Sequence, residues 1–143
     1  MNKSTKSMFG ATLLEIMLVL AVAAMIIVMS VRYYQSANQG QQSNAFVEQI
    51  QGITATVESV AQSGGGYTAA TLAAITPLLP ASAFTAPWGG ALQYAPSSTG
   101  YVVTLSPAPS TAVCSLVQAR LQSDTHYTIP AGCATVTYVG AGS

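Results

Sequence analysis

The longest pattern in the chain is an unbroken apolar run near its N-terminus. Residues 11–31 contain one charged side chain, Glu15, and only two other polar residues, Thr12 and Ser30. These 21 residues match the ~20 that a helix needs to cross the hydrocarbon of a bilayer. A carboxylate within such a run costs ~2.5–3.5 kcal/mol at mid-helix on insertion scales, and less nearer an end. The run therefore predicts a membrane-spanning helix, and the presence of one acidic residue in it needs a physical explanation.

The flanks of this run indicate how it is oriented. A short polar segment with Lys3 and Lys6 precedes it, and Arg32-Tyr33-Tyr34 follows it. Arg and Tyr suit the membrane–water interface, and basic residues favour the cytoplasmic side. No small-x-small cleavage sequence follows the run, as it would in an ordinary secretory signal. We therefore expect the helix to be retained, with the rest of the chain outside the cytoplasm.

Beyond the run the pattern changes to a one-sided helical stripe. Apolar residues recur at steps of 4, 3, 4 and 3, namely Phe46, Ile50, Ile53, Val57 and Val60. Gly64-Gly65-Gly66 is expected to end this helix. A polar stretch containing Gly40 separates the stripe from the apolar run, and Gly costs a helix about 1 kcal/mol relative to Ala. Two interpretations stay open: one helix from Ala11 to about Gln62, or two helices with a break near Gly40.

The remaining sequence predicts short elements typical of an antiparallel sheet. In chain order these are a short helix at 71–75 capped by Thr68 or Thr71, a turn at 88–90, strands at 91–95 and 101–105, a helix from Ser110 or Thr111 to Leu121, and β segments at 127–129 and 133–139. The second helix has apolar positions at Val113, Leu116, Val117, Ala119 and Leu121. The predicted fold class is α+β, with a long N-terminal helix packed on a small antiparallel sheet.

Composition limits both the number of domains and the class of partner. Residues 35–143 are enough for one small domain. The chain has four basic and four acidic side chains and a net charge of zero, so no basic surface for nucleic acid is expected. A polar but almost uncharged domain suits an exported protein packed among copies of itself. A weakly charged secreted domain would explain the same composition.

The sequence offers no pattern for catalysis, a metal or a cofactor. His126 has only Asp124 nearby and no second ligand at metal-binding spacing. Glu48 and Glu58 form no acid–base pair that spacing identifies. No serine lies in a nucleophile elbow, and Gly64–Gly66 lacks the Lys of a phosphate loop. We therefore expect a protein that is not an enzyme and needs no cofactor.

The segment around the start of the apolar run resembles the N-terminus of type IV prepilins. That signature is a short basic leader ending in Gly, a few residues ending in Glu at the fifth mature position, and a long apolar run. Here the leader ends at Gly10, and Ala11-Thr12-Leu13-Leu14-Glu15 follows. Ala11 departs from the usual first residue, which is Phe, or Met or Leu in the type IVb branch.

Two features of the C-terminal part are similar to the type IVb branch. Pro87-Trp88-Gly89-Gly90 before a strand resembles a Pro-Phe-Gly-Gly turn. An even number of cysteines beyond an export segment favours a disulfide and an oxidising compartment, with two unrelated buried thiols as the alternative. The resemblance implies a bond between Cys114 and Cys133, which would close a loop of ~20 residues and stabilise the domain by about 3 kcal/mol.

The resemblance also implies an organisation and a function. It divides the chain into a leader (1–10), a transmembrane and filament-core helix (11–34), and the rest of the helix with a globular α+β domain (35–143). A prepilin peptidase would cut between Gly10 and Ala11, and the new Ala11 amine would be the candidate for N-methylation. Glu15 would face the Ala11 ammonium of a neighbouring subunit and set the axial register.

The implied partners are copies of the chain, the prepilin peptidase, the pilus assembly machinery of the inner membrane, and membrane lipid before assembly. The subunit would sit in the inner membrane with a periplasmic domain and then in an extracellular pilus. Such pili serve adhesion, aggregation, motility, DNA uptake or conjugation.

Two alternatives stay open. One is a minor pilin or a pseudopilin of type II secretion, although pseudopilins usually lack this disulfide and the major ones often carry a calcium site, for which Asp124 alone does not suffice. The other is a single-span anchored periplasmic binding module in which the match at Gly10–Glu15 is accidental.

Overall fold

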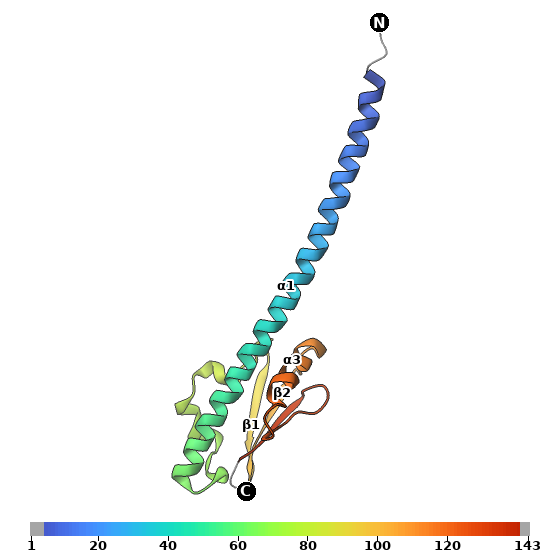
Figure 1. Ribbon diagram of the computed structural model, residues 1–143. Coiled ribbons are helices and arrows are strands. Elements are labelled where there is room, and N and C mark those ends of the chain that lie inside the picture. The colour runs from blue at the N-terminus through green and yellow to red at the C-terminus, as the bar shows by residue number, and fades with distance from the viewer. Residues whose placement is uncertain (1–4, 141–143) are drawn as a thin grey trace. The chain divides into compact units, whose positions relative to one another are not determined.

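The computed structural model describes the backbone of residues 5–140 and the side chains of residues 12–140. Helix α1 (Thr5–Gly64) is followed by shorter helices and strands (Figure 1). The chain forms two compact units, the first ending at Asn38 and the second beginning at Gln39. The second unit is a small antiparallel sheet with helices packed on it, so the predicted α+β class is confirmed.

Helix α1 is continuous through Gly40, so the alternative of two helices with a break there is wrong. A Cβ added at Gly40 would meet no atom within 4 Å, so close packing does not require the glycine. The end of the helix agrees with the prediction. Gly65 and Gly66 have φ values of +93° and +107°, and the Gly66 N–H donates to the Ala61 carbonyl at 2.9 Å, as in a Schellman cap.

The second unit continues with short elements. In chain order they are η1 (Tyr67–Ala69), α2 (Leu72–Ile75), η2 (Thr76–Leu78), η3 (Ala81–Phe84), β1 (Ala91–Pro96), β2 (Gly100–Ser106), α3 (Thr111–Leu121), β3 (Tyr127–Thr128) and β4 (Thr135–Val139). Thr71 is the N-cap residue of α2, but its side chain makes no capping bond. The predicted strand at 127–129 is one residue shorter, and the strand at 133–139 begins only at Thr135.

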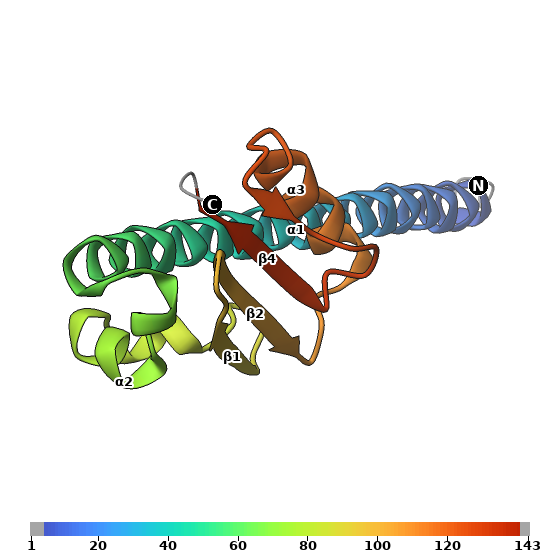
Figure 2. The ribbon, with the colours of Figure 1, turned by 90° about the horizontal axis from the view of Figure 1, so that it is seen from below.

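The four strands form one antiparallel sheet in the order β1-β2-β4-β3 (Figure 2). Val103 of β2 pairs with Tyr94 of β1 and with Val136 of β4, so β2 lies inside the sheet. Alternate residues point to one face, because successive side chains in a strand leave on opposite sides. The buried face consists of Leu92, Tyr94, Tyr101, Val103, Leu105, Val136 and Tyr138.

The α1 stripe fills the core of this unit. Phe46, Ile50, Ile53 and Val57 are fully buried, and Val60 is partly buried, as the periodicity predicts. Residues 39–64 of α1 therefore present one apolar face to the same core as the buried face of the sheet.

The aromatic rings of Phe46 and Trp88 pack at a centroid distance of 5.0 Å, and the Trp88 indole N–H donates to the Pro107 carbonyl at 3.1 Å. The turn before β1 thus contacts both α1 and the segment after β2.

Helix α3 begins as expected, because the Ser110 side chain accepts a bond from the Val113 N–H at 3.4 Å. The expectation that Leu116 and Ala119 share the apolar face of the helix is wrong, since both are exposed. At 100° per residue, the buried Val113, Val117 and Leu121 lie on one face, whereas Leu116 and Ala119 turn away from it.

A disulfide joins Cys114 of α3 to Cys133, just before β4, with the two Cα atoms 5.6 Å apart. Both cysteines are buried. The Gln118 side-chain amide donates to the Pro130 carbonyl at 3.2 Å, which holds the same turn against α3. The inferred disulfide is therefore confirmed, and it ties the last strands to α3.

Polar side chains cross the interface between α1 and the sheet. We call Thr54, Glu58, Tyr101, Tyr127 and Tyr138 the tyrosine seam. The Thr54 hydroxyl donates to the Ile50 carbonyl at 2.8 Å and lies 2.7 Å from the hydroxyls of Tyr101 and Tyr127. One donated and two accepted bonds use the full capacity of a hydroxyl group. The Tyr138 hydroxyl donates to the Glu58 carboxylate.

Replacing Thr54 with Val should lower the free energy of unfolding by about 1–3 kcal/mol. Valine keeps the shape but removes the acceptor of the Tyr127 hydroxyl and leaves the Tyr101 hydroxyl only its longer bond to the Ile50 carbonyl, at 3.5 Å. Denaturant unfolding of the full chain in detergent, followed by the fluorescence of the single Trp88, measures the change. Thr56→Val is the matched control, since the Thr56 hydroxyl contacts only the Gly52 carbonyl of its own helix. Equal stability of the two variants would contradict the role of the seam.

Stability should fall as the pH rises above about 10. Burial raises the pKa of Tyr94 from 10.0 to about 12, and it also raises the pKa of Tyr101, Tyr127 and Tyr138. The unfolded chain therefore loses these protons first, so stability is complete below pH 10 and is lost between pH 10 and 12 for Tyr94. In a pH titration, complete tyrosinate absorbance should be reached only with loss of the native Trp88 fluorescence. Complete tyrosine ionisation with a native Trp88 signal would contradict this prediction.

Candidate functional site

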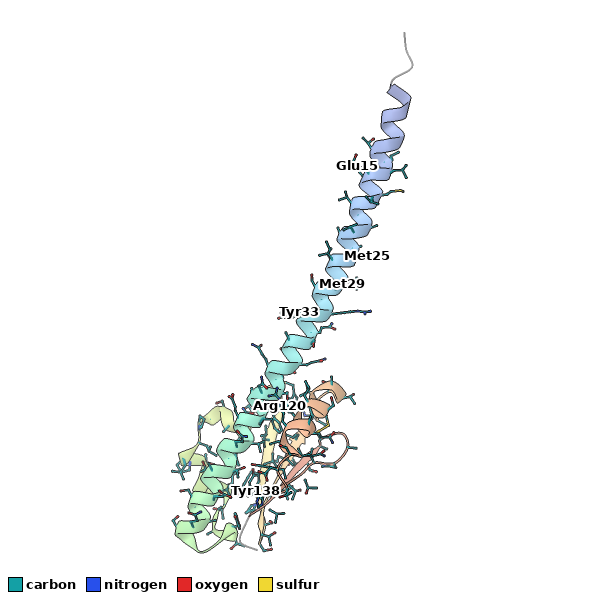
Figure 3. The ribbon with its side chains drawn as sticks, in the orientation of Figure 1. Glu15, Met25, Met29, Tyr33, Arg120 and Tyr138 are labelled. Atoms are coloured by element: carbon teal, nitrogen blue, oxygen red, sulfur yellow. A yellow bond between two sulfur atoms is a disulfide. The ribbon has the colours of Figure 1, made fainter. Side chains whose placement is uncertain are left out.

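Residues 12–31 of α1 carry most of the exposed large hydrophobic side chains in the described part of the chain. Their large hydrophobic side chains are 50–71% exposed, from Val31 at the lower end to Leu14 at the upper. They occupy 14 of the 20 positions, and successive positions are 100° apart, so they cover all sides of the helix. Figure 3 shows side chains leaving this part of α1 in several directions, Met25 and Met29 among them.

A helix that is apolar all round is buried in a membrane or in a bundle of other helices. Among the described residues, α1 is the one helix that is long and apolar enough to cross a membrane. Ser30 does not interrupt this character, because its hydroxyl donates to the Ile26 carbonyl of the same helix at 2.8 Å. Helix α1 therefore has the length and composition of a membrane anchor.

Glu15 is the one carboxylate on this surface. Thr12, Ile16, Val19 and Leu20 line a shallow hollow beside it. The side chain is exposed, and no residue from 12 to 140 forms an ion pair with it. Burial of Glu15 in lipid or between helices would therefore require either a proton or a cation from elsewhere.

The helix dipole does not stabilise Glu15 in the uncut chain. Helix α1 begins at Thr5, ten residues earlier, and the dipole acts mainly within the first turn. A helix that began at Ala11 would place Glu15 close to its first turn. The favourable position of Glu15 therefore depends on removal of the preceding segment.

The predicted cleavage position lies at the border of the described region. The backbone of Gly10 and Ala11 is helical and belongs to α1. The side chains of residues 1–11, including Lys3 and Lys6, lie outside the described residues. Cleavage before Ala11 and its N-methylation therefore stay predictions.

The apolar surface ends at Arg32, Tyr33 and Tyr34, all exposed, with Tyr33 at 80% and Tyr34 at 72%. Figure 3 shows Tyr33 on the helix beyond Met29. Amphipathic rings next to a cation match the composition of a membrane–water boundary. The apolar segment is thus bounded by interfacial residues at the end where the second unit follows.

The other polar groups noted from the sequence have local roles. The His126 Nδ1 lies 2.7 Å from the Val139 carbonyl, and the His126 backbone N–H donates to the Asp124 carboxylate at 3.0 Å. No group of three or more His, Cys, Asp or Glu side chains gathers in the part of the chain that the structure describes. Glu58, which spacing left isolated, is bonded by Tyr138 from the far end of the chain. In the sequence, the one sign of these contacts was Thr54, a polar residue within an otherwise apolar stripe.

No protein-family model matches this chain, and no curated protein or solved structure shows significant similarity to it. The likeness of residues 10–15 to prepilin N-termini therefore rests on the sequence of that segment and on the apolar run behind it.

Membrane retention should depend on residues 12–31. Replacing both Leu20 and Ala24 with Arg puts two charges near the middle of the segment, at ~2.5–3.5 kcal/mol each. The full chain should then leave the membrane pellet on carbonate extraction. The control is Gln51→Arg with Ala55→Arg, two exposed positions with the same spacing on the later part of α1. Retention of the Leu20/Ala24 variant, or loss of the control, would contradict the assignment of the anchor.

Proposed function

We propose that this protein is a structural subunit of a bacterial type IV pilus, cut between Gly10 and Ala11 and polymerised into a helical surface filament. The observation that carries the proposal is the segment 12–31 of α1, which is apolar on all sides and bears a single unpaired carboxylate five residues after Gly10. A membrane anchor alone has no need for that carboxylate.

The same segment would occupy two environments in succession. Before assembly, lipid would cover its apolar surface, with the second unit in the periplasm. After cleavage, the segments of neighbouring copies would cover one another. Ala21, Ala23 and Ala24 leave space for helices to approach closely, as small residues do in membrane helix pairs.

Glu15 would control how the copies align. Cleavage at Ala11 creates an α-ammonium group four residues before Glu15, at the new end of the helix. An unpaired charge inside an apolar bundle costs several kcal/mol. When two neighbouring copies are shifted along the filament axis by the right amount, Glu15 of one would pair with the Ala11 ammonium of the other, which removes that cost. At any other shift the charge would stay unpaired and the cost would remain.

The second unit would be the surface of the filament. The stripe residues of this unit and the segment 12–31 belong to the same helix, α1. The disulfide Cys114–Cys133 suits an oxidising compartment. The proposed partners are other copies, the prepilin peptidase and the inner-membrane assembly machinery. The final location would be an extracellular pilus.

Mass spectrometry of the mature protein tests the first step. We expect a chain that starts at Ala11, with or without a methyl group on its amine. An intact Met1 would instead indicate a simple anchored module and would contradict the proposal. Electron microscopy of surface filaments then distinguishes an abundant subunit from a minor one.

Replacing Glu15 with Ala should leave cleavage intact and reduce filament yield by roughly tenfold or more, since ~1.4 kcal/mol of lost pairing corresponds to a factor of ten. Glu15→Gln should behave in the same way, because it removes the charge and keeps the shape. Ser30→Ala is the control, a polar-to-apolar change in the same segment whose hydroxyl bonds only within the helix. Filament counts on cells measure the effect, and a normal yield from Glu15→Ala would overturn the proposed role.

A further inference from the structure

Two opposite charges of α1 have no partner in their own copy. Arg32 is exposed at the end of the apolar segment, and Glu48 is exposed in the second unit. Neither side chain forms an ion pair or a hydrogen bond with any residue from 12 to 140. Side chains of a helix meet at spacings of three or four, and the residues at these spacings from either charge are uncharged. Arg32 and Glu48 themselves are 16 positions apart in α1, too far to reach each other.

The other charges of the second unit have local stabilisation. Glu58 and Asp124 each accept a hydrogen bond from another residue of this unit. Arg120 lies in the last turn of α3, where the carbonyl ends of the helix favour a cation. In the described chain beyond the apolar segment, this leaves one cation and one anion, Arg32 and Glu48, without a counterpart.

The surroundings of Glu48 leave room for a long side chain from another molecule. Three small residues share its side of α1, three positions before it and four and seven positions after it, namely Ala45, Gly52 and Ala55. A Cβ added at Gly52 would meet no atom within 4 Å, so nothing described in the same copy requires a glycine there. Glycine weakens a helix relative to alanine, whereas small residues let another helix approach closely. This side of α1 therefore suits a contact with a second copy.

Arg32 needs an anion both in a membrane and in a filament. A guanidinium cannot be deprotonated in proteins, so Arg32 keeps its charge in either place. With Tyr33 and Tyr34 exposed beside it, Arg32 matches the membrane–water boundary, where lipid phosphates would lie within its reach. A copy that leaves the bilayer for a filament gives up those phosphates. Neighbouring copies then cover the end of the apolar segment, and an unpaired cation covered in this way is costly.

We propose that in the filament Arg32 of one copy pairs with Glu48 of another copy, an inference that rests on the proposed function. A guanidinium binds both oxygens of a carboxylate in a fixed geometry, so the pair selects one placement of the two copies. The two residues belong to different surfaces, and contact between different surfaces of identical chains continues from copy to copy. Arg32 thus exchanges a lipid phosphate for the Glu48 carboxylate when the copy is assembled.

Exchange of the two charges in the full chain tests this pair. Arg32→Glu or Glu48→Arg alone places like charges opposite each other and should lower filament yield by roughly tenfold or more. The double variant Arg32→Glu/Glu48→Arg restores the pair with its signs exchanged, and its yield should return to within about threefold of the unchanged chain. Electron microscopy of cells counts the filaments. Carbonate extraction of the membranes checks that each variant is inserted before assembly.

The matched control combines Arg32→Glu with Asp124→Arg. It has the same net charge as the double variant, and the second change again replaces an exposed acid of the second unit. Its yield should stay as low as that of Arg32→Glu alone. Trp88 fluorescence of the isolated full chain in detergent checks that the second unit of each variant is folded.

The outcomes separate this pair from the proposed function. Rescue by the exchanged pair and not by the Asp124 control supports the pair. Normal yield from both single variants, no rescue by the exchanged pair, or equal rescue by the control overturns it and leaves the proposed function standing. Failure of the unchanged chain to form any filament overturns both.

Discussion

The burial of one face of α1 against the sheet is the interaction on which the second unit depends. Phe46, Ile50, Ile53 and Val57 are fully buried, and burial of each such side chain contributes roughly 1.5–3 kcal/mol. Residues 12–31 of the same helix are not covered in this way by any of residues 12–140, and their apolar side chains lie on every side. One helix therefore carries two kinds of apolar surface, and among the described residues only the later one is buried.

The tyrosine seam fixes the position of α1 along the sheet. Apolar contacts alone tolerate small shifts of a helix over a sheet, whereas the Thr54 hydroxyl must meet Tyr101 and Tyr127 at hydrogen-bond distance. The Glu58 carboxylate accepts from Tyr138 one turn further along. An unsatisfied polar group in such a place costs about 1–3 kcal/mol, so a misaligned helix is penalised more than it would be by poor packing alone.

Periodicity predicted the features that depend on local sequence. The stripe of α1, its stop at Gly64–Gly66 and the start of α3 at Ser110 follow from spacing and capping, and the structure confirms them. The partners of Thr54 and Glu58 lie 47 to 80 residues away in the chain, which spacing cannot reveal. Leu116 was misplaced because α3 has apolar residues on both faces. Gly40 stays helical because its cost of about 1 kcal/mol is small against the burial of the stripe that follows in the same helix.

The chain has so few charged residues that hardly any group is available to pair with Glu15. Of the other acids, Glu58 is bonded by Tyr138, Asp124 by the His126 backbone, and Glu48 is exposed on the second unit. The cation that the structure describes in the first unit is Arg32, 17 residues beyond Glu15 and about 25 Å away along a helix rising 1.5 Å per residue. That distance is too long for an ion pair. Once lipid or neighbouring helices cover the apolar surface, a charged Glu15 needs a cation from the chain's own amino terminus or from another copy. The free amine that the proposed cleavage would create at Ala11 of a neighbouring copy would meet that need.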